Sequence, residues 1–333
     1  MPDKGTDPRP NRVPVSVITG FLGSGKTTLL NHLVSQEGMQ STAVIVNEFG
    51  EVGLDHVLVE SAIENVLLLE NGCICCSVRG DLVDTICDLF AKARNAQIPQ
   101  FTRILIETTG LAYPGPIVQS LQSDEAIIRR CALDCVIAMV DGVQGAAQMK
   151  QYEEAAAQIA QADIVLLSKS DLGAVETLEQ LRRDIAHINP AVAIFAVEYG
   201  RIDPHRLFRS PGAEHSFSAT HHHHHNGSGG EHRHGEIVTC SLLHEAPLDE
   251  ARLRHWLAMI FSLKPHAMLR LKGFVRLSNA SKPLLIQAVG GIVSPFEWLD
   301  DWPDGRPETR LVLIFKGMSA HAVKKSFERH VLA

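Results

Sequence analysis

The chain has 333 residues, which is long for one domain, and its formal net charge of −7 argues against a broadly basic surface for nucleic acid. Hydrophobic residues make up 45% of it, enough for a sizeable core, but no apolar run is long enough to span a membrane. Seven cysteines, three of them close together, favour a cytoplasmic protein with reduced thiols over a secreted disulfide framework.

The most informative stretch near the start of the chain is Gly20-Phe-Leu-Gly-Ser-Gly-Lys-Thr27, which fits the phosphate-binding pattern G-x-x-x-x-G-K-S/T. A buried strand is predicted before it, over 13–19, and a helix after it, over 28–35. In this context the loop's backbone N–H groups and the helix N-terminus bind phosphate. We expect Lys26 to reach the β- and γ-phosphates and the Thr27 hydroxyl to coordinate Mg²⁺. A chance glycine-rich turn is the alternative, which the flanking elements disfavour.

Short apolar strands then alternate with helices, which predicts an α/β fold: a P-loop NTPase parallel sheet with helices on both faces. Ligands of such sheets bind outside the carboxyl ends of the strands. The expected strands are 42–47, 66–69, 103–107, 135–141, 163–167 and 191–197, and the expected helices are 81–93, 144–160 and 174–187.

Composition divides the chain into four parts. Residues 1–11 are polar and proline-rich, so we expect a disordered stretch and no signal peptide. Residues 12–209 form the P-loop domain, and 210–235 form a histidine-rich flexible linker with too little apolar content to fold alone. Residues 236–333 contain three consecutive strands without helices between them, which predicts a small α+β domain with an antiparallel sheet.

Two strand ends carry the remaining nucleotide-site candidates. Glu107 ends a strand of the Walker B type, where a carboxylate holds Mg²⁺ directly or through water; capping of the next turn is the alternative. Ser168-Lys-Ser-Asp171 occupies the place of the guanine-recognition motif Asn-Lys-x-Asp. Asp171 can accept from guanine N1–H and the exocyclic amine, and the stem of Lys169 can cover the base. Such a segment can also begin a helix as an N-cap, so alone it is a weak signal.

Three thiols, Cys73, Cys75 and Cys76, lie on what we predict to be one short loop. Soft thiolates favour Zn²⁺ or a related thiophilic ion over Mg²⁺. Buried structural cysteines or a redox Cys-x-x-Cys pair are the alternatives. The other four cysteines, Cys87, Cys131, Cys135 and Cys240, lie in apolar patterns and are expected in the core.

A histidine cluster in the linker is interpreted as a weak, exchangeable metal-gathering loop, since neutral imidazole is a good ligand for Zn²⁺, Co²⁺ and Ni²⁺. A purification-tag insertion or a low-complexity loop is the alternative. The expected auxiliary ligands are His221, His222, His223, His224, His225, His232 and His234.

Five segments in this order, GFLGSGKTTLL, VNEFGEVGLD, NGCICCSVRGDL, ILIETTGLAYP and LLSKSDL, resemble the CobW-like family of metal-handling P-loop GTPases. The resemblance implies a GTP-hydrolysing metallochaperone that binds zinc or cobalt at Cys73, Cys75 and Cys76 and delivers it to a client protein. It also implies a Mg²⁺ site that includes Glu107. The residues implied to bind GTP are Gly20, Gly23, Ser24, Gly25, Lys26, Thr27, Thr28, Lys169 and Asp171. Two departures from the family pattern are Ser168, for the usual Asn, and Tyr113, where an acidic residue is expected.

The predicted mechanism is that the metal loop responds to the nucleotide state, because it lies between the acidic loop 48–55 and the strand ending in Glu107. A metal buffer or sensor with an incidental GTPase is the competing hypothesis, and a P-loop small-molecule kinase is a third. The client and the water-positioning group are not evident. Oligomeric state stays open, with a nucleotide-dependent homodimer suggested only by analogy with related GTPases.

Overall fold

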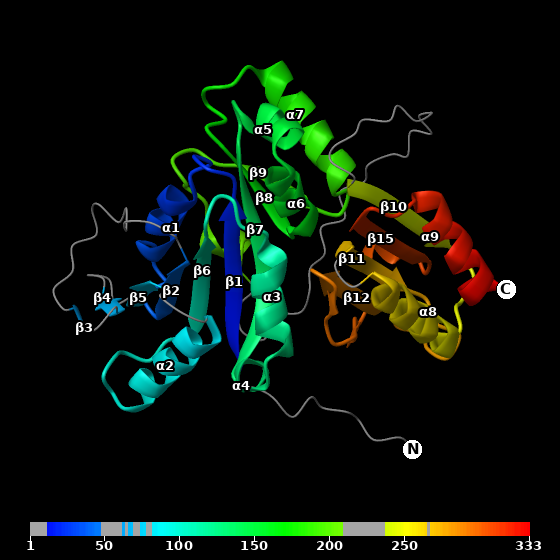
Figure 1. The fold of residues 1–333 in the computed structure, drawn as a ribbon, viewed down its shortest axis with the longest axis horizontal. Helices are drawn as coiled ribbons and strands as arrows, with labels where there is room; N and C mark the ends of the chain where they lie inside the picture. Colours follow the sequence, from blue (N-terminus) through cyan, green and yellow to red (C-terminus); the bar gives the residue numbers. More distant parts are fainter. Residues whose placement is uncertain are drawn as a thin grey trace.

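The computed structural model describes residues 12–47, 62–63, 66–68, 74–77, 82–208, 237–264 and 267–333 (Figure 1). Within these ranges, the first part of the chain forms a nine-stranded sheet in the order β3-β4-β5-β2-β6-β1-β7-β8-β9. All pairings from β5 to β9 are parallel, and only the β3–β4 and β4–β5 pairings are antiparallel. The predicted parallel α/β sheet is therefore confirmed.

The strands of this sheet are β1 (Val13–Gly20), β2 (Thr42–Asn47), β3 (Ala62–Ile63), β4 (Val66–Leu68), β5 (Ile74–Ser77), β6 (Arg103–Thr108), β7 (Cys131–Asp141), β8 (Ile164–Ser168) and β9 (Ala193–Ala196). Its helices are α1 (Lys26–Val34), α2 (Leu82–Arg94), α3 (Pro114–Ser123), α4 (Glu125–Ile128), α5 (Gly145–Gln151), α6 (Glu153–Gln161) and α7 (Val175–Ile188). A short 3₁₀ turn spans Pro204–Arg206.

Helices cover both faces of the sheet, and alternate residues of each strand pack against helices on opposite faces. On β7, Val136 joins the core under α2, α3 and α4, and Ala138 joins the core under α6 and α7. The intervening Ile137 packs on the opposite face with Leu29 and Leu33 of α1. Strands buried on both faces explain why β1, β6, β7 and β8 read as continuous apolar runs.

Two helix predictions need correction. The single helix expected over 144–160 is interrupted at Tyr152, whose extended backbone (φ −123°, ψ 122°) separates α5 from α6. The ring of Tyr152 stacks on Phe21 of the glycine loop, with centroids 4.6 Å apart, and this contact stabilises the break. Helix α3 was missed because it begins Pro114-Gly-Pro; proline is tolerated in a first helical turn, where the N–H groups have no helical partner.

The last part of the chain forms a second, antiparallel sheet in the order β10-β15-β11-β12-β13, with β14 also paired to β12. Two helices cover one face of it, around a core that includes Trp256, Leu313 and Phe327. The predicted α+β character is confirmed. Its elements are β10 (Ile237–His244), α8 (Glu250–Leu263), β11 (Met268–Val275), β12 (Leu284–Val289), β13 (Ile292–Val293), β14 (Glu297–Trp298), a 3₁₀ turn (Pro303–Gly305), β15 (Thr309–Lys316), α9 (Ala320–Phe327) and a terminal π-helical turn (Glu328–Leu332).

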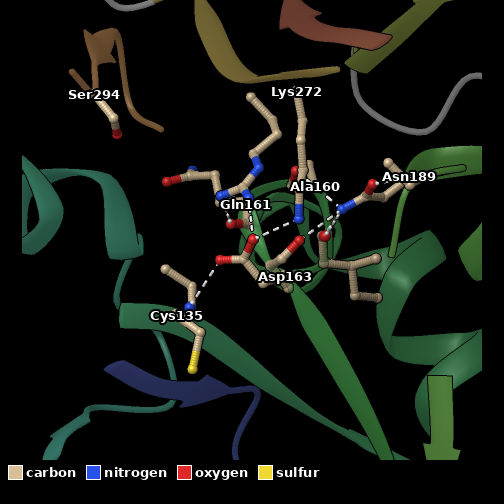
Figure 2. Close-up of polar contacts among 12 residues, drawn as sticks. Cys135, Ala160, Gln161, Asp163, Asn189, Lys272 and Ser294 are labelled. Atoms are coloured by element: carbon tan, nitrogen blue, oxygen red, sulfur yellow. Dashed lines mark hydrogen bonds and ion pairs between the residues drawn. The ribbon is translucent and has the colours of Figure 1, made fainter. Parts of the chain in front are cut away.

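The second sheet packs against α6, so that α6 lies between the two sheets (Figure 1). Leu269 of β11 and Ile314 of β15 enter the apolar core that α6 and α7 form with the first sheet. Beside this core, Asp163 accepts from Lys272 at 3.0 Å, as Figure 2 shows. Asp163 also accepts from Arg270. The two sheets are thus joined by a mixed apolar and ionic interface. No helix within the described ranges combines the length and the apolar character needed to cross a membrane.

Candidate functional site

The glycine loop joins β1 to α1 at the carboxyl edge of the parallel sheet. Gly20 has φ 144°, and a Cβ there would lie 2.4 Å from the Met139 carbonyl oxygen, so only glycine fits. Gly25, in the left-handed region at φ 94°, is the N-cap of α1. The Nζ of Lys26, a buried residue, donates to the Gly20 and Phe21 carbonyl oxygens at 3.0 and 3.4 Å. The loop therefore curls around its lysine in front of the α1 N-terminus, as an anion site requires.

Glu107 lies next to this loop in the adjacent strand β6, and its side chain is buried. The Thr27 hydroxyl donates to Glu107 Oε1 at 2.9 Å. A hydroxyl and a carboxylate oxygen so close together are hard donors, which fit Mg²⁺ rather than a thiophilic ion. The two residues expected at the Mg²⁺ site are thus adjacent, and they are the ones that would hold the ion. Bound there, Mg²⁺ would neutralise phosphate charge.

The segment after β8 meets the same loop. The Ser168 hydroxyl donates to the Ser24 carbonyl oxygen at 2.7 Å, so serine makes a bond to the P-loop in place of the usual asparagine. Lys169 Nζ donates to the Gly23 carbonyl oxygen at 3.0 Å and to Asp141 Oδ2 at 2.7 Å. Since α7 begins only at Val175, with Ala174 as its N-cap, the segment is not a helix cap.

Asp171, the third member of this group, is exposed rather than buried. Its carboxylate accordingly lies at the rim of the site. The P-loop, Glu107 and the Ser168–Asp171 segment therefore meet at one edge of the sheet, which is the arrangement that the strand order predicts.

Gln158 of α6 is a site-adjacent residue that the sequence did not reveal. Its buried side-chain amide donates to the carbonyl oxygens of Gly110 and Ala112, at 3.1 and 3.0 Å, and so holds the segment that follows Glu107. A Cβ on Gly110 would lie 2.5 Å from the side chain of Leu22 in the P-loop. A lone glutamine in an alanine-rich helix carries no pattern that would have identified it.

Tyr199 and Gly200 form a second missed feature, in the turn after β9. Gly200 has φ 71°, and a Cβ there would lie 2.8 Å from Leu29 Cα and 2.9 Å from the Thr28 carbonyl oxygen. The turn therefore packs tightly against the first turn of α1. It leaves Tyr199 exposed beside the nucleotide edge, which is the carboxyl edge of the sheet where the P-loop, Glu107 and the Ser168–Asp171 segment meet. The Tyr-Gly pair after a predicted strand was the available signal.

The expected metal site is only partly described. Cys75 and Cys76 lie in β5, paired with Val44 and Ile45 of β2, so two of the three thiols are in a strand and not in the loop that we predicted. Cys73, residues 48–55 and the histidines at 221–225, 232 and 234 lie outside the described residues. Within the described part, no group of three or more His, Cys, Asp or Glu side chains could hold a metal ion.

The other cysteines behave as core residues. Cys131, Cys135 and Cys240 are buried, whereas Cys87 is half-buried. Burial raises the pKa of the Cys131 thiol to about 12 and also raises the pKa of Cys135 and of Cys240. A raised pKa disfavours the thiolate that metal ligation needs, and burial accordingly fits these three thiols to the core.

Two family models match the chain. The model of the CobW/HypB/UreG nucleotide-binding domain matches residues 14–196, and that of the cobalamin synthesis protein cobW C-terminal domain matches residues 237–331.

Individual proteins resemble the chain over nearly its full length. The zinc chaperone YjiA of Escherichia coli (strain K12) is 34% identical over 319 residues, 95% of this chain and 98% of its own length. The zinc chaperone CobW of Pseudomonas aeruginosa is 35% identical over 348 residues, 94% of this chain and 90% of its own. The crystal structure of Zn(II)-bound YjiA GTPase from E. coli superposes with a TM-score of 0.77 at 34% identity, covering 96% of this chain and 99% of that one.

Proposed function

This chain belongs to the CobW/HypB/UreG family, and we propose that it is a GTP-hydrolysing metallochaperone that binds zinc and delivers it to a client protein in a nucleotide-dependent way. The observation that carries the proposal is one sheet edge on which the P-loop, the Thr27–Glu107 pair and Lys169 meet. Its full-length relatives are named zinc chaperones, and the similar solved structure is a zinc-bound GTPase.

In this proposal each part of the edge has one task. Thr27 and Glu107 hold Mg²⁺, Lys26 neutralises the β- and γ-phosphates, and Lys169 and Asp171 bind guanine. The phosphates lie on the backbone N–H groups of the loop, formed by Gly20, Gly23, Ser24, Gly25, Lys26, Thr27 and Thr28. The close Thr27–Glu107 contact and the curled loop support these roles.

The cargo metal is held by Cys73, Cys75 and Cys76, whose soft thiolates suit Zn²⁺, with Co²⁺ as the alternative. The histidines at 221–225, 232 and 234 serve as weak auxiliary ligands that gather metal. The names of the full-length relatives favour zinc over cobalt.

Strand register supports a link between metal and nucleotide. The backbone of Cys76 pairs with Ile45, Ile45 pairs with Ile106, and Ile106 directly precedes Glu107. Two strand spacings of about 4.8 Å place the Cys76 backbone roughly 10 Å from that of Ile106, in the same continuous sheet. The proposed coupling between the Mg²⁺–phosphate site and the strand that carries two of the thiols therefore has only one intervening strand, β2, to cross.

The partner that this function requires is a metal-dependent client protein, and the compartment that suits free thiolates is the cytoplasm. A homodimer that forms when GTP is bound would make the metal loops of both protomers depend on the nucleotide state. Linkage requires that metal and GTP change each other's affinity by the same factor.

The test of the nucleotide part compares wild type with Glu107→Gln. Wild type should hydrolyse GTP in the presence of Mg²⁺, and the variant should lose at least tenfold in kcat, because one Mg²⁺ ligand is neutralised. Zinc binding to the nucleotide-free variant should match that of wild type. Hydrolysis at the wild-type rate in Glu107→Gln would show that the Mg²⁺ assignment is wrong.

A further inference from the structure

Asp141, the last residue of β7, uses both of its carboxylate oxygens beside the nucleotide edge. Oδ1 accepts the backbone N–H groups of Val143 and Gln144 at 2.8 and 3.0 Å, and Oδ2 accepts from Lys169 Nζ at 2.7 Å. The side chain is only 3% exposed. Asp141 lies outside the five sequence segments that carry the nucleotide and metal motifs.

The Lys169 side chain is anchored by two contacts of its ammonium group. Its ammonium lies between Asp141 and the Gly23 carbonyl oxygen of the P-loop, while its backbone is in the left-handed region at φ 52°. The side chain is 42% exposed, so the carboxylate fixes the ammonium and leaves much of the stem accessible. A free lysine side chain loses much of its rotamer entropy when it is immobilised. Asp141 removes much of that cost before a ligand arrives, because it orders the stem in advance.

The backbone keeps the two residues opposite each other. Asp141 pairs with Ser168 in the β7–β8 register, and the Gly142 N–H donates to the Ser168 carbonyl oxygen at 2.8 Å. A Cβ on Gly142 would lie 2.7 Å from that oxygen and 3.3 Å from the Lys169 carbonyl oxygen. The turn after β7 therefore lies directly against the Ser168–Lys169 peptide, which keeps Asp141 opposite Lys169.

The charge of Asp141 is stable in this setting. Burial alone would raise its pKa, but the hydrogen bonds from Lys169 and from the Gln144 and Val143 N–H groups outweigh it and hold the pKa below its ordinary value. Asp141 is therefore ionised throughout the neutral range, as a fixed anchor for a lysine must be.

We propose that Asp141 is a positioning residue of the base site: it fixes the Lys169 ammonium so that the lysine stem covers one face of the purine, while Asp171 reads the edge of the ring. The inference rests on the guanine site of the proposed function. Packing of the Lys169 stem on the face of the purine does not depend on the substituents at the edge of the ring. Asp141 therefore contributes affinity for GDP and for inosine diphosphate alike, whereas Asp171 contributes the difference between them.

The experiment measures the Kd values of GDP and inosine diphosphate for four full-length proteins: wild type, Asp141→Asn, Asp171→Asn and Asp134→Asn. Asp134 is a matched control, because it is an equally buried aspartate on the same strand, paired with Arg103 at 2.8 Å, far from the nucleotide edge. Asp141→Asn should weaken both ligands by a similar factor, about tenfold or 1.4 kcal/mol. Asp134→Asn should leave both Kd values within twofold of wild type. Asp171→Asn should reduce the preference for GDP over inosine diphosphate.

A double-mutant cycle with Lys169→Met separates positioning from folding. If Asp141 acts through Lys169, adding Asp141→Asn to Lys169→Met should cause no further loss of affinity. Asp141→Asn with wild-type Kd values, or a full additional loss in the double variant, would overturn the proposal. Unchanged discrimination in Asp171→Asn would instead refute the proposed guanine edge contact, and with it the premise on which Asp141 was assigned.

Discussion

Replacing Asp163 with Asn should weaken the interface between the two sheets, because this carboxylate pairs with two cations of the second sheet, Arg270 and Lys272. It faces the guanidinium of Arg270, which is 2% exposed, and the ammonium of Lys272 at 3.0 Å (Figure 2). Removing one partner of a buried ion pair costs about 3–5 kcal/mol, since the remaining charge stays buried without compensation. We expect Asp163→Asn to lower the free energy of unfolding by about 3 kcal/mol. The exposed pair Lys282–Asp300 provides the control, and Asp300→Asn should cost less than about 1 kcal/mol.

The assay is urea unfolding followed by two probes. All three tryptophans, Trp256, Trp298 and Trp302, lie in the second domain, so their fluorescence reports that domain, whereas far-UV circular dichroism reports both. In wild type the two transitions should coincide. In Asp163→Asn the fluorescence transition should move to lower urea and separate from the main dichroism change. Equal midpoints for Asp163→Asn and Asp300→Asn would refute the reasoning.

The same residue predicts a pH dependence. Burial alone would raise the pKa of Asp163, but the charges of Arg270 and Lys272 outweigh burial and hold it well below its ordinary value. A depressed pKa adds stability that is present above the unfolded pKa of about 3.9 and is lost as the pH falls further. The difference in unfolding free energy between wild type and Asp163→Asn should therefore be constant from pH 5 to 7 and shrink below about pH 4. A difference that persists undiminished at pH 3 would contradict the assignment.

Two further substitutions test the contacts around the P-loop. Gln158→Leu leaves the carbonyl oxygens of Gly110 and Ala112 without their donor; it should cost about 1–3 kcal/mol in urea unfolding and reduce kcat for GTP more than it weakens GDP binding. An equal loss in kcat and GDP affinity would mean that Gln158 does not act on this segment alone. Ser168→Ala removes the 2.7 Å bond to Ser24 and should weaken GDP binding about fivefold by calorimetry, roughly 1 kcal/mol; an unchanged Kd would leave that bond without a role in binding.

The nucleotide edge could be predicted from the sequence because its parts depend on local patterns. A continuous apolar strand, a glycine loop and the start of a helix are adjacent in the chain, and parallel strands bring their carboxyl ends to one edge. The family resemblance is confirmed by the two matching family models. Ser168, the main departure from the family pattern, proves to bond to the P-loop itself.

What the sequence could not reveal depends on tertiary contacts. The break at Tyr152 follows from a stack on Phe21, which is more than 100 residues away in the chain. Strand β5 was missed because Cys75 and Cys76 stand in a short segment rich in turn residues, which is extended by pairing with β2 on one side and β4 on the other. The Asp141–Lys169 ion pair joins residues 28 positions apart. Predicting this ion pair would have required the β7–β8 register, which the composition of the two strands does not specify.

The central claim is that nucleotide state controls zinc held by the Cys73, Cys75 and Cys76 thiols. The most direct measurement is a zinc competition titration against a chromophoric chelator, on wild type and on the triple cysteine-to-serine variant, each with GDP and with a non-hydrolysable GTP analogue. We predict that tight binding is lost in the variant and that the wild-type affinity differs by tenfold or more between the nucleotides, about 1.4 kcal/mol. Equal affinities in the two nucleotide states, or tight binding that survives in the variant, would contradict the account and favour a metal buffer whose GTPase is incidental.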